Sequence, residues 1–145
     1  MNKVQQYKLY VVDDDEGYRK SLVQLLESAD YSVESFPSAQ DFLDSVSAAH
    51  ETGVLIMDLR MPGMNGFALQ KKLTELVSRL EIVFITADAQ PGDRERAFRS
   101  GAAAFLQKPL QEEILFGTLD SALGRFTVKN QKKGRLNEKK KNQIE

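Results

Sequence analysis

Four short apolar runs constrain the fold of this chain more than any other feature of its sequence. They span residues 9–12, 54–57, 82–85 and 102–106. None of them alternates with polar residues, and such strands are typical of a sheet that is covered on both faces, as parallel sheets are. Residues 31–36 carry more polar side chains and are predicted as a fifth strand at the edge of the sheet.

Segments with helical spacing separate these runs. Ser38 with Asp41 three residues later is typical of a helix N-cap, and Gly101 is placed to end a helix. The apolar stripes of the five expected helices are Leu22, Leu25, Leu26 and Ala29; Phe42, Leu43 and Val46; Phe67, Leu69, Leu73 and Leu76; Ala97 and Phe98; and Ile114, Leu115, Leu119 and Leu123. This alternation predicts an α/β fold: a flavodoxin-like, doubly wound five-stranded parallel sheet of order 2-1-3-4-5 with five helices.

Length and charge favour one domain with an appended tail. A chain of 145 residues has room for one well-filled core. Residues 129–145 hold seven basic and two acidic residues, whereas residues 1–128 hold 13 basic and 19 acidic ones. We therefore predict a folded domain over 1–128 and a basic tail or truncated linker over 129–145. The absence of cysteine excludes thiolate sites, and the polar amino end predicts a cytoplasmic protein that does not enter a membrane.

Acidic residues directly follow two of the apolar runs: Asp13 to Glu16 after the first, and Asp58 after residues 54–57. In the predicted strand order these two strand ends are neighbours at the topological switch point, so their carboxylates are expected to share one crevice. Like charges there would repel one another, and a hard divalent cation such as Mg²⁺ relieves that repulsion. A carboxylate can also act as a nucleophile that forms an aspartyl-phosphate, and Asp58 is the candidate nearest the centre.

The other strand ends carry a hydroxyl group and a cation. Thr86 follows residues 82–85, and Lys108 follows residues 102–106. A lysine at this position can stabilise charge on a transferring group. A cis bond before Pro109 would turn Lys108 into the crevice, but the residues alone leave the isomer open. Taken singly, an acidic run after a strand is most often a solvated helix start, which is the role expected for Asp15 and Glu16.

Several separated motifs occur in order along residues 8–124. They are Val12-Asp13-Asp14, the block from Met57 to Gly66, Thr86-Ala87, Gly101-Ala102 and Lys108-Pro109. Together they resemble the response-regulator receiver family, the phosphoacceptor half of two-component signalling. The resemblance implies that Asp58 accepts a phosphoryl group from a sensor histidine kinase, and that the protein is a regulatory switch whose only chemistry is self-catalysed phosphoryl transfer and autodephosphorylation.

The same resemblance implies roles for individual residues. Asp14 would bind Mg²⁺ directly, Asp13 would help directly or through water, and Asp58 and the backbone carbonyl of Arg60 would complete the protein ligands. Thr86 and Lys108 would contact the phosphoryl oxygens. Phe105 matches an aromatic switch position. Arg60 and Asp88 match positions that modulate dephosphorylation, and their opposite charges predict a pair across the mouth of the site.

The expected partners follow from the same family. Charges on the fourth helix (Arg94, Arg96 and Arg99) and on the fifth (Glu112, Glu113 and Asp120) suggest a phosphorylation-promoted homodimer through helix 4, strand 5 and helix 5. Receivers of this kind often precede a DNA-binding output domain, which the 145 residues do not include. The basic tail is read as a linker or extension rather than a nucleic-acid arm, because it lacks interleaved aromatic residues past Phe126.

Three other functions compete with this one. A haloacid-dehalogenase-like phosphatase also uses an aspartate nucleophile with Mg²⁺, but it needs a second aspartate two positions on, where this chain has Arg60. A flavodoxin-like cofactor binder needs a phosphate-cradling loop after the first strand, and here that loop is acidic. An unphosphorylated protein-binding scaffold stays open, although the complete set of site residues argues against it.

Overall fold

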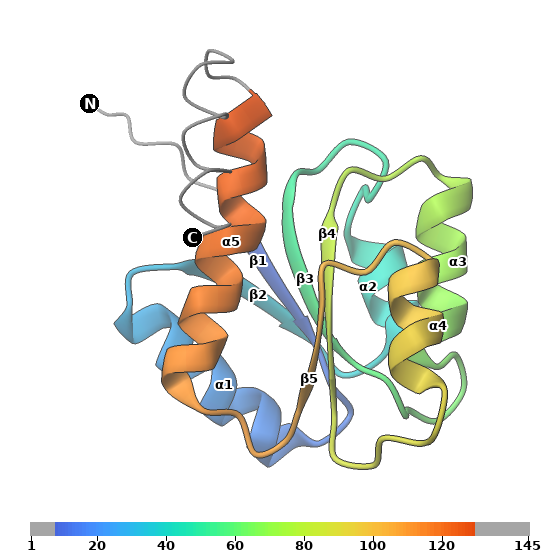
Figure 1. Cartoon of the computed structure of the whole chain (residues 1–145), viewed down its shortest axis with the longest axis horizontal. Helices are drawn as coiled ribbons and strands as arrows, with labels where there is room; N and C mark the ends of the chain where they lie inside the picture. Colours follow the sequence, from blue (N-terminus) through green and yellow to red (C-terminus); the bar gives the residue numbers. More distant parts are fainter. Residues whose placement is uncertain (1–7, 130–145) are drawn as a thin grey trace.

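A computed structural model describes residues 8–129 of the chain, with side chains as far as residue 124. Five strands alternate with five helices (Figure 1). The strands are β1 (Lys8–Val12), β2 (Ser32–Phe36), β3 (Gly53–Asp58), β4 (Glu81–Thr86) and β5 (Ala104–Gln107). The helices are α1 (Glu16–Ser28), α2 (Ala39–Ser45), α3 (Gly66–Glu75), α4 (Asp93–Arg99) and α5 (Glu112–Lys129). The predicted alternation is confirmed, although β5 begins two residues later than expected.

The five strands form one parallel sheet in the order β2-β1-β3-β4-β5, as predicted. Val12 of β1 lies opposite Met57 of β3, and Asp58 of β3 lies opposite Ile85 of β4. The residue after Val12, Asp13, therefore leaves β1 level with Asp58. This register brings Asp13, Asp58 and Thr86 to the same edge of the sheet.

The sheet is covered on both faces, which explains why its central strands are apolar without alternation. On one face Leu9 and Val11 of β1 pack with α1 and α5, and on the other Tyr10 and Val12 pack with α2, α3 and α4 (Figure 1). Not every residue of the predicted stripes is buried. Leu76, Phe98 and Ile114 are 45%, 40% and 51% exposed, and Leu76 is the C-cap residue that follows α3 rather than part of the helix.

Local capping explains where the helices next to the strand ends begin. Asp15 accepts the N–H of Tyr18 at 3.1 Å and caps α1, and Ser38 accepts the N–H of Asp41 at 3.0 Å and caps α2, as predicted. Helix α3 begins at Gly66, where a Cβ atom would lie 2.8 Å from Cε1 of Phe84. Glycine therefore lets α3 pack directly against the end of the sheet.

Two further expectations concern the periphery. Gly101 has a positive φ of 102° and follows α4, as predicted for a residue that ends a helix. His50 is exposed, as expected. Of the predicted basic tail, only Lys129, the last residue of α5, lies within the described range; the rest lies outside it.

Candidate functional site

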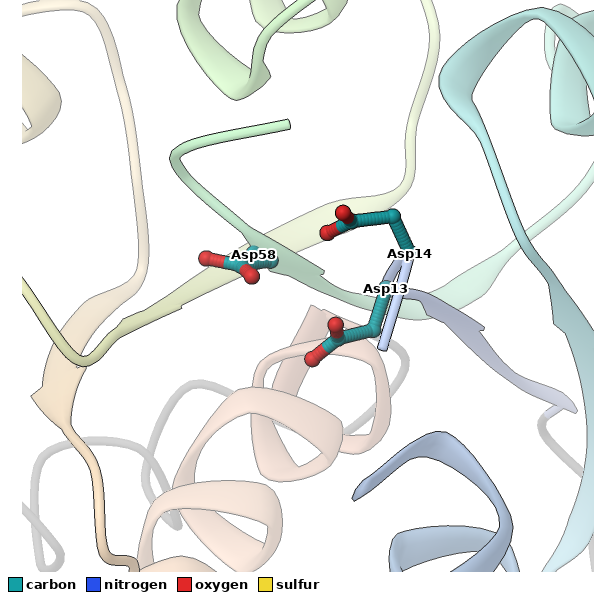
Figure 2. Close-up of side chains that lie close together, drawn as sticks. All are labelled: Asp13, Asp14 and Asp58. Atoms are coloured by element: carbon teal, nitrogen blue, oxygen red, sulfur yellow. The ribbon is translucent and has the colours of Figure 1, made fainter. Parts of the chain in front are cut away.

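Three carboxylates meet where β1 and β3 end (Figure 2). Asp13, Asp14 and Asp58 each offer an oxygen, and these oxygens all lie within 4.8 Å of one another. Asp13 is fully buried and Asp58 is 8% exposed, whereas Asp14 is exposed. Because burying like charges together costs free energy, the site requires a compensating positive charge.

Lys108 supplies part of that charge. Its Nζ donates to Oδ2 of Asp13 at 2.9 Å and to Oδ2 of Asp58 at 3.4 Å. The Lys108–Pro109 peptide bond, whose isomer the sequence left open, is cis. One ammonium group from the end of β5 thus joins the carboxylates of β1 and β3.

Asp13 is held by its own neighbourhood as well. Its Oδ1 accepts the backbone N–H of Asp15 at 2.9 Å, and its backbone carbonyl accepts Nη1 of Arg19 at 2.7 Å. The contact from Arg19 was missed by the sequence analysis. The contact could have been anticipated because Arg19 lies in the first turns of the helix that directly follows the acidic run. Asp13 is therefore a fixed part of the site, while the exposed Asp14 makes no hydrogen bond among the described residues.

The protonation behaviour of Asp58 and Lys108 reflects this crowding. Burial and the negative charge of Asp13 raise the pKa of Asp58 above its ordinary value, against the opposing effects of Lys108 and of the Arg60 N–H, which donates to Oδ1 at 3.3 Å. Burial lowers the pKa of Lys108, but its hydrogen bonds and charge interactions with Asp13 and Asp58 outweigh that effect and raise it overall. The shift of Asp58 is caused first by burial and then by the neighbouring charge of Asp13, whereas that of Lys108 is caused by its two carboxylate partners.

Thr86 lies at the end of β4, the strand end predicted for it, and Phe105 lies in β5. Thr86 is fully buried at the end of β4, and its Oγ1 accepts the N–H of Asp88 at 3.1 Å. Phe105 is 6% exposed, with its ring centroid 6.5 Å from that of Phe84. The aromatic side chain is therefore turned inward against the core.

The predicted pair between Arg60 and Asp88 is wrong. Arg60 instead forms an ion pair with Asp93, the first residue of α4, and Asp88 accepts Nε2 of Gln90 at 2.6 Å. Asp93 is 8% exposed and also accepts the backbone N–H of Gln90. A buried carboxylate with two donors holds the guanidinium more strongly than the exposed Asp88 could, because it is shielded from competing water.

The donor set fits a hard divalent cation. Three carboxylates at one edge of the sheet match the oxygen ligands that Mg²⁺ prefers, and a cation there would offset the repulsion between the neighbouring carboxylates of Asp13 and Asp58. The carboxylates at the ends of adjacent strands, with a partly buried lysine and a buried threonine around them, could also receive a phosphoryl group.

Comparison with known proteins decides the family. A family model for the response regulator receiver domain matches residues 9–120. The chain belongs to this family. Receivers of this type are the regulated components of two-component systems, and the matched range includes all the site residues named above.

The receiver is similar to several named response regulators. It is 36% identical over 134 residues to the response regulator protein TodT of Pseudomonas putida, an alignment that covers 92% of this chain and 59% of TodT. It is 36% identical over 115 residues to the transcriptional regulatory protein FixJ of Bradyrhizobium diazoefficiens, covering 79% of this chain and 56% of FixJ. The receiver thus spans little more than half the length of these relatives.

Solved structures give the same result. The response regulator StyR matches with a TM-score of 0.79 and 35% identity, over 97% of this chain and 69% of StyR. The structure of FixJ-N matches with a TM-score of 0.74 and 32% identity, over 82% of this chain and 94% of that one. Among the described residues, no helix of the receiver has the length and apolar character needed to span a membrane.

Proposed function

We propose that Asp58 is the phosphoacceptor of this receiver and takes its phosphoryl group from a sensor histidine kinase. The observation that carries the proposal is the contact of Lys108 Nζ with both Asp13 and Asp58. That ammonium lies beside the oxygen that would attack and can bind the oxygens of the incoming group. Thr86, on the neighbouring strand, would contribute its hydroxyl once Oγ1 is reoriented from the Asp88 N–H.

The proposed transfer is a single displacement at phosphorus. A carboxylate oxygen of Asp58 forms the new P–O bond while the P–N bond to the kinase histidine breaks, and the histidine nitrogen keeps the electron pair. Hydrolysis by water later restores the carboxylate and releases inorganic phosphate. Because the product of the transfer is a modified side chain, the receiver acts as a switch; a haloacid-dehalogenase-like phosphatase is not favoured, since position 60 holds an arginine that is bound to Asp93.

Asp14, Asp13 and Asp58 are the residues proposed to hold Mg²⁺, together with the backbone carbonyl of Arg60. Bound there, Mg²⁺ would neutralise charge on the carboxylates and the phosphoryl oxygens. Asp14 is the best candidate for direct contact because it is exposed and has no hydrogen bond among the described residues, whereas Asp13 is already bound by Lys108 and Asp15.

Labelling with a small phosphodonor tests the proposal. We expect phosphoramidate with Mg²⁺ to add one hydroxylamine-sensitive phosphoryl group to the wild type, and chelation of Mg²⁺ to prevent it. Asp58→Ala should abolish the modification. Asp44→Asn, which alters an exposed carboxylate on α2, should leave it unchanged. Absence of labelling, or equal labelling of Asp58→Ala, would refute the assignment and would favour an unphosphorylated scaffold.

The surface proposed to respond lies along α4, β5 and α5. A groove of about 540 Å³ there is lined by Arg94, Phe105, Pro109 and Ile114, among others. We propose that phosphorylation changes this surface and promotes a homodimer across it. Of the charges predicted to take part, Arg94 lines this groove, whereas Arg96 and Arg99 line a second groove between α3 and α4. Light scattering before and after labelling tests the dimer.

The relatives suggest the wider context. FixJ is called a transcriptional regulatory protein, and the receiver covers just over half of it. We therefore propose that the receiver works with a DNA-binding output domain, with residues 129–145 as part of the connection. The cytoplasm, predicted from the sequence, is the proposed location. A gel-shift comparison of a chain with an attached output domain, with and without phosphodonor, would test this coupling.

A further inference from the structure

Tyr18 covers the ammonium group that joins the two buried carboxylates. The Nζ atom of Lys108 lies 4.1 Å from the centroid of the Tyr18 ring. Tyr18 sits in the first turn of α1, where its backbone N–H donates to the N-cap Asp15 at 3.1 Å. Asp15 in turn donates its own N–H to Asp13. The ring is therefore attached, through one short segment of backbone, to the same carboxylate that Lys108 binds.

The ammonium of Lys108 has three N–H donors, and two are directed at carboxylates, Asp13 at 2.9 Å and Asp58 at 3.4 Å. The face of the Tyr18 ring occupies another side of the same group. Only 13% of the Lys108 side chain is exposed. A cation over an aromatic face is held more strongly when little water competes for it, which is the situation here.

A lysine needs such support because its stem is flexible. Four methylene groups allow the ammonium many positions, and a misplaced cation stabilises a transferring group poorly. Once Asp58 carries a phosphoryl group, one of its carboxylate oxygens belongs to the new P–O bond, and the ammonium must find phosphoryl oxygens nearby. The ring is a fixed, uncharged surface that restricts where the ammonium can go during that exchange.

We propose that Tyr18 is a positioning residue for phosphoryl transfer, which acts by holding the Lys108 ammonium against the site with its ring face. This inference rests on the proposed function of Asp58 and extends it to a residue outside the acidic cluster. The ring, rather than the hydroxyl group, carries the effect. Tyr18→Phe therefore retains the contact, whereas Tyr18→Leu removes it while keeping an apolar side chain.

The first experiment compares initial rates of labelling with phosphoramidate and Mg²⁺. Tyr18→Leu is expected to lower the rate at saturating donor by about three- to tenfold, with little change in the donor concentration at half-saturation. Tyr18→Phe is expected to stay within about twofold of the wild type, since it keeps the ring face. Tyr31→Leu is the matched control, because it removes a tyrosine ring that stacks on Phe116, with centroids 6.4 Å apart, instead of one that lies on Lys108.

The second experiment separates positioning from a general structural effect. In a Lys108→Ala background, Tyr18→Leu is expected to cause no further loss of labelling rate, because the group that the ring holds is gone. A merely structural role would lower the rate in both backgrounds. Nuclear magnetic resonance of the wild type gives a measurement independent of any variant: the ε-protons of Lys108 should be shifted upfield by the ring.

Each outcome has one meaning. Labelling of Tyr18→Leu at the wild-type rate, an equal additional loss in the Lys108→Ala background, or ε-protons of Lys108 at their ordinary shift would overturn the role of Tyr18. A wild type that is not labelled at Asp58 would instead overturn the proposed function. The two failures are thus distinguishable in a single set of measurements.

Discussion

Arg60 and Asp93 form an ion pair that joins the segment after Asp58 to the first residue of α4. The Asp93 side chain is 11% exposed and that of Arg60 is 39% exposed. Asp93 has therefore lost most of its contact with water, while Arg60 keeps much of its own. The pair ties the loop that follows Asp58 to the helix whose surface is proposed to respond.

This asymmetry predicts unequal costs of breaking the pair. Arg60→Gln is expected to lower the free energy of unfolding by about 1–3 kcal/mol, because it leaves a nearly buried carboxylate with only the Gln90 N–H. Asp93→Asn is expected to cost about 1 kcal/mol or less, because Arg60 can turn into water. Urea unfolding of both variants measures the difference. A larger cost for Asp93→Asn would contradict this account.

The same pair bears on the lifetime of the phosphorylated state. We expect Arg60→Ala to lose its phosphoryl group about two- to tenfold faster than the wild type, since the side chain that Asp93 holds across the loop no longer limits the approach of water. Arg79→Ala, at an exposed position before β4, is the control. The decay of labelled protein after removal of phosphodonor measures this lifetime, and an equal or slower decay in Arg60→Ala would exclude a shielding role.

Packing at the start of α3 predicts a contrast between two glycines. Gly66→Ala would place Cβ 2.8 Å from the ring of Phe84 and 3.1 Å from the backbone oxygen of Asp58, so we expect it to destabilise the fold by about 1–3 kcal/mol. Gly117→Ala on α5 meets no atom within 4 Å and should stabilise it by up to about 1 kcal/mol. Thermal unfolding of both variants measures the two changes in stability. Equal changes for Gly66→Ala and Gly117→Ala would show that α3 can shift to accommodate the added Cβ atom.

Tyr10 predicts a dependence of stability on alkaline pH. Burial, and then its hydrogen bond to Oε1 of Glu51 at 2.9 Å, raise the pKa of Tyr10 above its ordinary value. The folded state therefore keeps this proton where the unfolded state loses it. The resulting stability is complete below about pH 10, the ordinary tyrosine pKa, and is lost progressively as the pH rises from there toward the folded-state pKa.

Tyr10→Phe isolates that contribution. Near pH 8 the variant should be less stable by about 0.5–1.5 kcal/mol, the value of one hydrogen bond. Above pH 10 the wild type should lose stability more steeply, so the difference should shrink. Chemical unfolding across this pH range provides the measurement. A constant difference would mean that Tyr10 titrates alike in both states.

Much of the fold could be predicted from local pattern. Apolar runs without alternation indicated buried parallel strands, and the strand order then followed from short right-handed connections. Boundaries were less predictable, as at β5, because a run of alanines suits the end of a loop as well as a strand. The exposure of Ile114 on α5 and of Leu76, which follows the end of α3, depends on how each helix is oriented and where it ends, and hydrophobicity alone does not resolve either.

The sequence by itself determined the sheet, its order and the meeting of Asp13, Asp14, Asp58 and Thr86 at one edge, because parallel strands bring their carboxyl ends together. The cis bond before Pro109 and the contacts of Lys108 with Asp13 and Asp58 were decided by the tertiary structure. Only the tertiary structure decided which charges pair. Arg60 binds Asp93, 33 positions along the chain, rather than Asp88. The Tyr18 ring contacts Lys108, which is 90 positions away in the sequence. Such contacts depend on how the helices pack against the sheet and on which charged partners are shielded from water. The local spacing of apolar residues predicts neither.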